Sequence, residues 1–250
     1  MVARGTPPPK KISHDAIIEA IFEMRFDQKS LSEIFYGKLA GHQRWSSYVP
    51  RSTGLAQLPK QLIDADPNLR YQPRIEAIAA DSHSSLRIGE HSLSFHRKAP
   101  YTGWAQFREE LSSVVTSFFD CAADPTVTRL GLRYINALNA EKHGVHSFAD
   151  LDVTTTIAGQ PMSSDLNLNF SSRLGERSRA TVRIASQSFI QGELPDGTTV
   201  VVDLDVYTED DVTMTLRPTV TDWIEFAHGK EKDEFFHLFK QEMIDSWRED

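Results

Sequence analysis

The sequence has one cysteine, no long apolar run and a deficit of positive charge. Cys121 has no partner for an internal disulfide, and its aromatic neighbours favour a buried thiol, which suits a reducing cytoplasm. Apolar stretches such as Ala20–Phe22 and Val200–Val202 are far shorter than the roughly 20 residues of a membrane-spanning helix. No apolar segment follows the basic N-terminus, so we expect no secretory signal and no membrane partner, and a cytoplasmic location.

The charge balance bears on the class of partner. The chain has 250 residues, with 27 Lys and Arg against 35 Asp and Glu, a net charge of −8. Nucleic-acid binding requires a positive patch that displaces counterions from phosphates, so this balance argues against a nucleic-acid partner. A chain with 40% hydrophobic and 25% charged residues is an ordinary globular protein, long enough for one large domain or two small ones.

Several catalytic and cofactor signatures are missing. The sequence contains no G-x-G-x-x-G or G-K-[ST] phosphate cradle, no G-x-S-x-G elbow and no H-E-x-x-H helix. We therefore expect no cofactor, and we expect binding rather than catalysis.

The first half has the pattern of a strand, a short helix, three strands and a long helix. Residues 1 to 11 are interpreted as a flexible tail and residues 46 to 73 as an irregular excursion. Apolar alternation predicts strands at Ala16–Phe26, Pro73–Ala80, Ser85–Ile88 and Ser92–Arg97, the last two joined by a tight hairpin at Gly89-Glu90. Helical spacing of apolar residues predicts a helix capped by Ser30, a short helix near Pro59–Ala65 and a long helix from Trp104 capped by Thr102.

The second half repeats this order. Strands are predicted at Val127–Leu138, Asp165–Phe170, Ala180–Ser186 and Val200–Tyr207, followed by a helical tail from Thr221 to Trp247 that His228-Gly229 breaks. A T-x-W-x-x-F motif opens the last helix of each half, at Trp104 and at Trp223. We therefore predict an internal duplication and an α+β fold: an antiparallel sheet from two related halves, residues 12–125 and 126–250, packed as one unit with long helices on one face.

Charged residues occupy the second face of the predicted strands. They are Glu19, Glu23, Arg25, Arg129, Arg133, Arg183, Asp203 and Asp205. On a shared sheet, one interpretation is a solvated face with cross-strand ion pairs. The other is a recognition surface on which arginines bind a carboxylate or phosphate, with Arg129 and Arg133 as anion anchors, Tyr134 and Asn136 as neighbouring contacts, and Glu19 and Glu23 as their resting partners.

Metal-binding interpretations are also open. Asp203 and Asp205 lie two residues apart on a predicted strand, so both carboxylates share a face, as a divalent-metal site for phosphate chemistry requires. A loop with the residue types of a zinc or iron site contains His143, His146, Asp150 and Asp152. In both places the alternative is that these residues form a solvated surface without a metal-binding role, and we assign no metal.

The octapeptide Arg129 to Asn136, RLGLRYIN, resembles the R-x-G-L-R-Y-I-N strand of a family of sporadically distributed bacterial and archaeal proteins of about this length. Further agreement comes from AIIEAIFEMRF at residues 16–26, LRIG at 86–89, YTGW at 101–104 and DLDVY at 203–207. The resemblance implies no activity, cofactor or site residue. The patchy distribution of the family implies, by association, a role in mobile or defence loci.

Three functions remain as hypotheses. The first is a non-enzymatic interaction protein, an accessory or regulator that holds a protein partner, or else a small anionic ligand, against the charged sheet face. The second is a small-molecule or nucleotide sensor whose pocket lies between the two halves, because junctions between repeats are common pocket sites. The third is a metal-dependent phosphodiesterase or nuclease that uses Asp203 and Asp205.

Overall fold

Two long strands, β1 (Ile17–Asp27) and β6 (Thr126–Asn139), form the centre of the fold. They pair antiparallel, with Phe22 opposite Leu132, and each buries every second side chain on one face. The structure is a computed structural model that describes residues 7–9, 11–28, 32–162, 165–209 and 212–248.

The sheet extends outward from this central pair in the same order on both sides. Next to β1 lie β5 (Ser92–Lys98), β4 (Ser84–Ile88), β3 (Ile75–Ile78) and β2 (Val49–Ser52). Next to β6 lie β11 (Thr198–Thr208), β10 (Ser178–Ser186) and β9 (Asn167–Arg173). All neighbours pair antiparallel, which confirms the α+β class with an antiparallel sheet. The matching strand order is the one that the proposed repeat predicts, with β2 as an addition to the first half.

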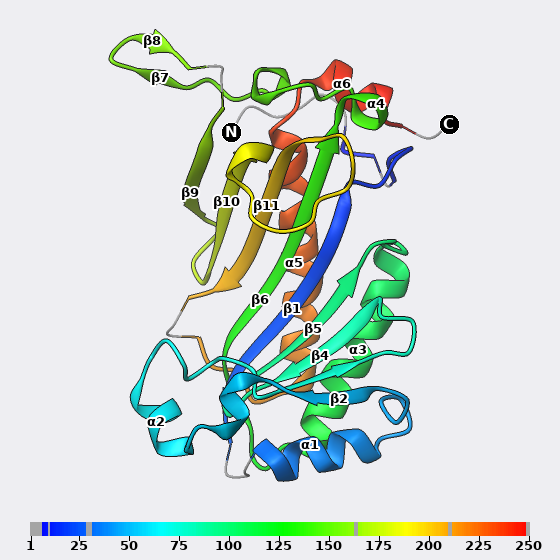
Figure 1. The fold of residues 1–250 in the computed structure, drawn as a ribbon, viewed down its shortest axis with the longest axis vertical. Helices are drawn as coiled ribbons and strands as arrows, with labels where there is room; N and C mark the ends of the chain where they lie inside the picture. The colour runs from blue at the N-terminus through cyan, green and yellow to red at the C-terminus, as the bar shows by residue number, and fades with distance from the viewer. Residues whose placement is uncertain (1–6, 10, 29–31, 163–164, 210–211, 249–250) are drawn as a thin grey trace.

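Helices cover one face of this sheet and leave the other open (Figure 1). The two long helices, α3 (Trp104–Cys121) and α5 (Arg217–His237), lie behind the strands, and α1 (Ser32–Gly41) packs on α3. The core between these layers is rich in phenylalanine, and burying each such ring stabilises the fold by about 1.5–3 kcal/mol. Its fully buried rings include Phe22, Phe26, Phe35, Phe95, Phe107 and Phe118.

Smaller elements complete the chain. They are α2 (Lys60–Ala65), α4 (Ala140–His143), α6 (Gln241–Ser246), the hairpin of β7 (Thr156–Ile157) and β8 (Gln160–Pro161), and 3₁₀ turns η1 (Gly54–Gln57), η2 (Phe148–Asp150) and η3 (Gln187–Phe189). No helix in the described ranges is long and apolar enough to cross a membrane.

The structure corrects three expectations about local structure. The 46 to 73 excursion contains β2, whose four exposed residues lack apolar alternation. Pro50 is tolerated within β2 because β2 is an edge strand of the sheet. The N-cap of α3 is Gly103, at φ +91°, and not Thr102. Helix α5 continues through His228 and Gly229, because its packing on the sheet outweighs the low helix propensity of one glycine. The proposed Ser30 cap lies outside the described residues.

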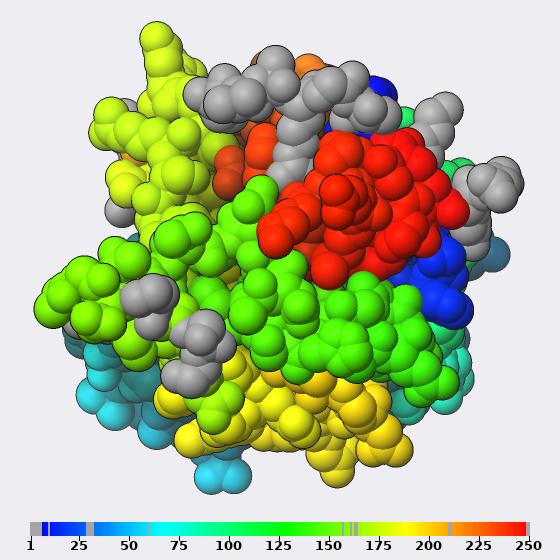
Figure 2. All heavy atoms as spheres, turned by 90° about the horizontal axis from the view of Figure 1, so that it is seen from above, coloured from blue at the N-terminus to red at the C-terminus, as the bar shows by residue number. Residues whose placement is uncertain are grey.

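The part of the predicted tail that the structure describes lies against the C-terminal end of the chain. Arg248 donates to the Pro7 carbonyl at 2.8 Å, and the Ser13 amide donates to the Trp247 carbonyl at 2.8 Å. The indole of Trp247 in turn donates to the His143 carbonyl at 2.9 Å. Figure 2 looks onto this end and shows the C-terminal residues in red beside the green segment that contains α4.

Candidate functional site

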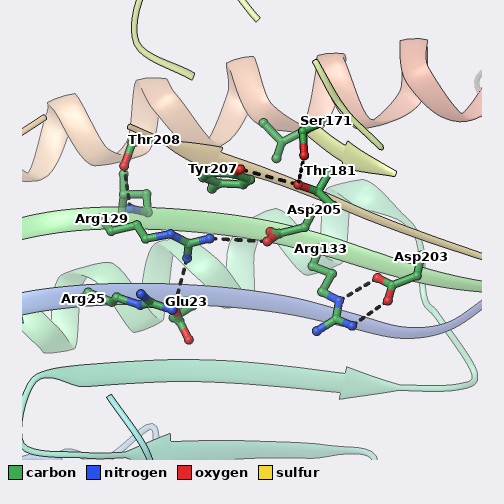
Figure 3. Close-up of polar contacts among 12 residues, drawn as sticks. Glu23, Arg25, Arg129, Arg133, Ser171, Thr181, Asp203, Asp205, Tyr207 and Thr208 are labelled. Atoms are coloured by element: carbon green, nitrogen blue, oxygen red, sulfur yellow. Dashed lines mark hydrogen bonds and ion pairs between the residues drawn. The ribbon is translucent and has the colours of Figure 1, made fainter. Parts of the chain in front are cut away.

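The open face of the sheet carries most of the charged residues that the sequence singled out. Glu19, Glu23 and Arg25 on β1 face the same side as Arg129 and Arg133 on β6, because their pairing register places them in adjacent rows. Asp203 and Asp205 on β11 lie opposite Ile135 and Arg133. The strands therefore gather these residues on one face, as predicted (Figure 3).

Arg129 is the most heavily partnered of these side chains. Its guanidinium donates to Glu23 at 2.9 Å and to Asp205 at 3.4 Å, and it stacks over the Tyr207 ring with 4.6 Å between the guanidinium carbon and the ring centroid. Gly131 makes room for it, because a Cβ there would lie 3.1 Å from an Arg129 nitrogen. With its side chain only 15% exposed, Arg129 already has the anion partners and the aromatic contact that a ligand would have to replace.

Arg133 and Asp203 form a two-pronged ion pair. The Nε and Nη2 atoms of Arg133 each lie 2.6 Å from a different oxygen of Asp203, the geometry in which a guanidinium binds a carboxylate most strongly. The Arg133 side chain is still 43% exposed.

The other predicted site residues on this face also have partners. Glu19 pairs with His96 at 2.9 Å. Burial is the largest single influence and opposes ionisation of Glu19, but the His96 hydrogen bond and the nearby positive charges together outweigh it and lower the pKa of the carboxyl. Arg25 donates to Glu23 at 2.8 Å and lies over the Tyr71 ring. Arg183 is different, because it donates only to Asn167 and to the Phe189 carbonyl, at 3.1 and 3.4 Å, and has no carboxylate partner in the described residues.

These contacts bear on the metal interpretations. Asp203 and Asp205 face arginines, which compete with a cation for the same oxygens. His143 is buried and its Nδ1 accepts from the Asn139 amide, whereas Asp150 caps η2 by accepting from the amides of His146 and Ser147. Among the described residues no three His, Cys, Asp or Glu side chains are placed to hold a metal ion.

Tyr134 and Asn136 do not belong to the charged face, which corrects their predicted role as neighbours of Arg129 and Arg133. A strand alternates its side chains, so residues 134 and 136 point away from residues 129 and 133, whose side the sheet leaves open. Tyr134 is 6% exposed and Asn136 is 4% exposed, and both lie beneath the helix layer.

Tyr134 and Asn136 line a cavity of about 580 Å³ between residues of the first and second halves of the chain. The first half contributes the segment before β1 and the loop after β5, including Tyr101 and Trp104; the second contributes β6 and the middle of α5. The full lining is Pro9, Lys11, Ile12, Ser13, Asp15, Ala16, Ile17, Tyr101, Thr102, Gly103, Trp104, Tyr134, Asn136, His228, Glu231, Lys232, Phe235 and Phe236. This size is in the usual range for small-molecule sites.

A chain of aromatic groups crosses the wall of the cavity. The Trp104 and His228 rings stack with 3.7 Å between centroids and 6° between planes, joining α3 to α5. His228 Nδ1 lies 3.3 Å from the Tyr134 hydroxyl, which lies 3.5 Å from the Tyr101 hydroxyl. Burial lowers the pKa of His228 to about 4 and raises the pKa of both phenols, so all three groups are uncharged near neutral pH.

Glu231 and Asn136 supply polar atoms deeper in the cavity. Glu231 is 2% exposed, and one of its oxygens accepts from the Val206 amide at 3.1 Å. Burial, reinforced by the charge of Asp205 across the sheet, raises the pKa of the Glu231 carboxyl well above its usual range. The Asn136 amide nitrogen donates to the Val202 carbonyl at 3.2 Å, which fixes the orientation of its side chain.

Sequence reasoning did not select most of the cavity residues. Tyr101 and Trp104 belong to the YTGW segment, and the second hypothesis placed a pocket between the two halves. His228 was interpreted as a helix breaker. Glu231 gives no signal, because a glutamate in a helix is ordinarily solvated.

Neither a scan against protein-family models nor a search of curated proteins finds a match to this chain.

Proposed function

We propose that the protein binds a small molecule in the cavity between its two halves. The observation that carries this proposal is the gathering of polar groups around a cavity of about 580 Å³: Glu231 and the Tyr134 phenol are buried, and His228 and the Tyr101 phenol are half-buried, with few hydrogen bonds among them. Ligand sites typically combine an apolar wall with a few such convergent polar groups. Because both halves contribute to the wall, a ligand there would couple them, as a sensor or regulator requires.

The test measures binding of an uncharged fluorescent naphthalene probe to the intact chain and to two variants. Trp104→Ala removes one wall of the cavity and the stack on His228, so we expect at least about a tenfold loss of affinity, equivalent to roughly 1.4 kcal/mol. The control is Phe226→Ala, which removes an aromatic ring from α5, the helix of His228; Phe226 is 39% exposed and does not line the cavity. Equal effects of the two variants, or no binding to the parent chain, would contradict a ligand site here.

The charged sheet face supports a second candidate, an interaction with an acidic partner protein. Arg129 and Arg133 are bound to carboxylates of the sheet. We therefore transfer the anchor role to Arg183 and Arg51, which form no ion pair with a carboxylate among the described residues. Cationic side chains also outnumber carboxylates on this face. The cations are Arg25, Arg51, Arg87, Lys98, Arg129, Arg133, Arg173, Arg179 and Arg183, against Glu19, Glu23, Glu76, Asp203 and Asp205.

Affinity capture from the native host, followed by mass spectrometry, separates the two candidates. A stoichiometric protein that is lost with Arg51→Glu and Arg183→Glu, but retained with Trp104→Ala, supports the interaction face. Co-purification of a small molecule that Trp104→Ala releases supports the cavity.

A further inference from the structure

The chemistry of the cavity indicates what kind of molecule it accepts. Near neutral pH the polar groups of its wall are neutral: half-buried His228 and Tyr101 and buried Tyr134 are uncharged, and the amide of buried Asn136 is fixed by the backbone. Lys11 and Asp15 are exposed and Lys232 is half-buried, so the ionic groups of the lining remain in reach of solvent. A charged ligand that enters deeply therefore meets no buried countercharge.

Glu231 is the decisive side chain. In the part of the chain that the structure describes, no lysine or arginine pairs with it, and the charges that act on it most strongly, those of Asp205 and Asp203, have the same sign as its ionised form. An unpaired ionised carboxylate that is 2% exposed is costly, and protonation relieves that cost. One oxygen accepts from the Val206 amide, so a proton on the carboxyl can point elsewhere.

We infer that the cavity selects an uncharged molecule with a carbonyl-type oxygen, and that the protonated carboxyl of Glu231 donates a hydrogen bond to that oxygen. This inference rests on the cavity being the ligand site. A carboxylic acid that an apolar environment keeps neutral is a strong donor to a carbonyl oxygen. Trp104, Phe235 and Phe236 supply the apolar wall against which the rest of such a molecule packs.

Four probes of similar size but different chemistry test the inference at pH 7. They are 2-acetylnaphthalene, which is neutral with a carbonyl acceptor; 2-ethylnaphthalene, which is neutral without one; the anion 2-naphthoate; and the cation 2-naphthylmethylammonium. We expect 2-acetylnaphthalene to bind about fivefold more tightly than 2-ethylnaphthalene, the ratio that one net hydrogen bond gives, and at least about tenfold more tightly than either ion.

Two substitutions assign the preference to Glu231. Glu231→Gln keeps an acceptor for the Val206 amide and a donor for the ligand, so the preference for the acetyl probe should persist. Glu231→Leu removes the donor, so acetyl and ethyl probes should bind alike. If Glu231→Leu folds poorly, Glu231→Gln still distinguishes a protonated from an ionised Glu231. An ionised Glu231 would make the ammonium probe the tightest binder of the parent chain, and Glu231→Gln would abolish that advantage.

The outcomes separate the two proposals. Tightest binding by either ion, or equal binding of the acetyl and ethyl probes by the parent chain, overturns the inference about ligand class and leaves the cavity as a binding site. Failure of all four probes to bind, or binding that Trp104→Ala does not weaken, overturns the proposed function itself.

Discussion

The two faces of strand β6 treat polar side chains in opposite ways. On the open face Arg129 and Arg133 each bind carboxylates of neighbouring strands, so their charges are compensated within the sheet. On the helix-covered face Tyr134 and Asn136 border a cavity together with Glu231, whose buried carboxyl pairs with no lysine or arginine of the described ranges. A dense set of charges in a sequence therefore marks a site less well than a few polar groups that the fold buries and leaves incompletely bonded.

The two halves of the molecule differ in a related way. Both contain the T-x-W-x-x-F motif, but in α3 Phe107 is fully buried and Trp104 reaches the cavity. In α5 the order is reversed: Trp223 is 8% exposed and donates to Ser178, whereas Phe226 is 39% exposed. The tryptophan of the motif lies at the cavity in α3 and in the core in α5, so the shared spacing does not give the two rings the same environment.

The largest expected loss of stability comes from removing a shared arginine of the charged face. Arg129→Ala leaves Glu23 and Asp205 as neighbouring carboxylates without their shared cation, so we expect a loss of about 3 kcal/mol in the free energy of unfolding, measured by urea denaturation. Probe binding in the cavity should be unchanged, because Arg129 points to the opposite face. A variant of normal stability would show that the ion pairs are not structural and would restore Arg129 as a candidate anchor.

The second prediction addresses the cavity through pH. His228 has a pKa of about 4 in the folded chain, lowered by burial, against an unfolded value near 6.5. As the pH falls from 6.5 to 4 the unfolded chain binds a proton that the folded chain does not, so stability decreases in this window. Between pH 7 and pH 4.5 the parent chain should therefore lose about 2 kcal/mol more than His228→Gln.

The difference between the two proteins is the measured quantity, so titration of Asp15, Glu231 and Lys232, which face the same cavity, cancels to first order. Parallel loss of stability in both proteins over this range would mean that His228 is not held neutral, and would weaken the argument for an uncharged cavity.

Much of the fold was predictable because strands and long helices have strong periodicity. The strand patterns at residues 16–26 and 127–138 located β1 and β6 to within one residue at each end, and the apolar stripe after Trp104 located α3. β2 was missed because its four exposed residues have no alternation, and the continuity of α5 was missed because the propensity of Gly229 was weighed without the sheet against which the helix packs.

The candidate site was predictable only in part. Alternation correctly placed the arginines and carboxylates on one face, but applied to RLGLRYIN the same rule places Tyr134 and Asn136 on the other, and their nearness in sequence led to the wrong grouping. The cavity combines residues 9–17 with segments around Tyr101, Tyr134 and His228, which are far apart along the chain, so no local pattern reveals it.

The smallest expected effect sharpens the comparison within the charged face. Arg183 is half-buried and makes exposed hydrogen bonds to Asn167 and the Phe189 carbonyl, with no carboxylate partner in the described ranges, so Arg183→Ala leaves no buried charge behind. We expect the free energy of unfolding to fall by no more than about 0.5 kcal/mol, measured by the same urea denaturation as for Arg129→Ala. A much larger loss would extend the structural network to the β10 edge of the sheet. If Arg183→Ala changes stability negligibly but abolishes capture of an acidic protein, Arg183 is a contact residue. A cation that has no carboxylate partner within the fold can be removed without destabilising it, so the loss of capture then reports a lost contact with the partner protein.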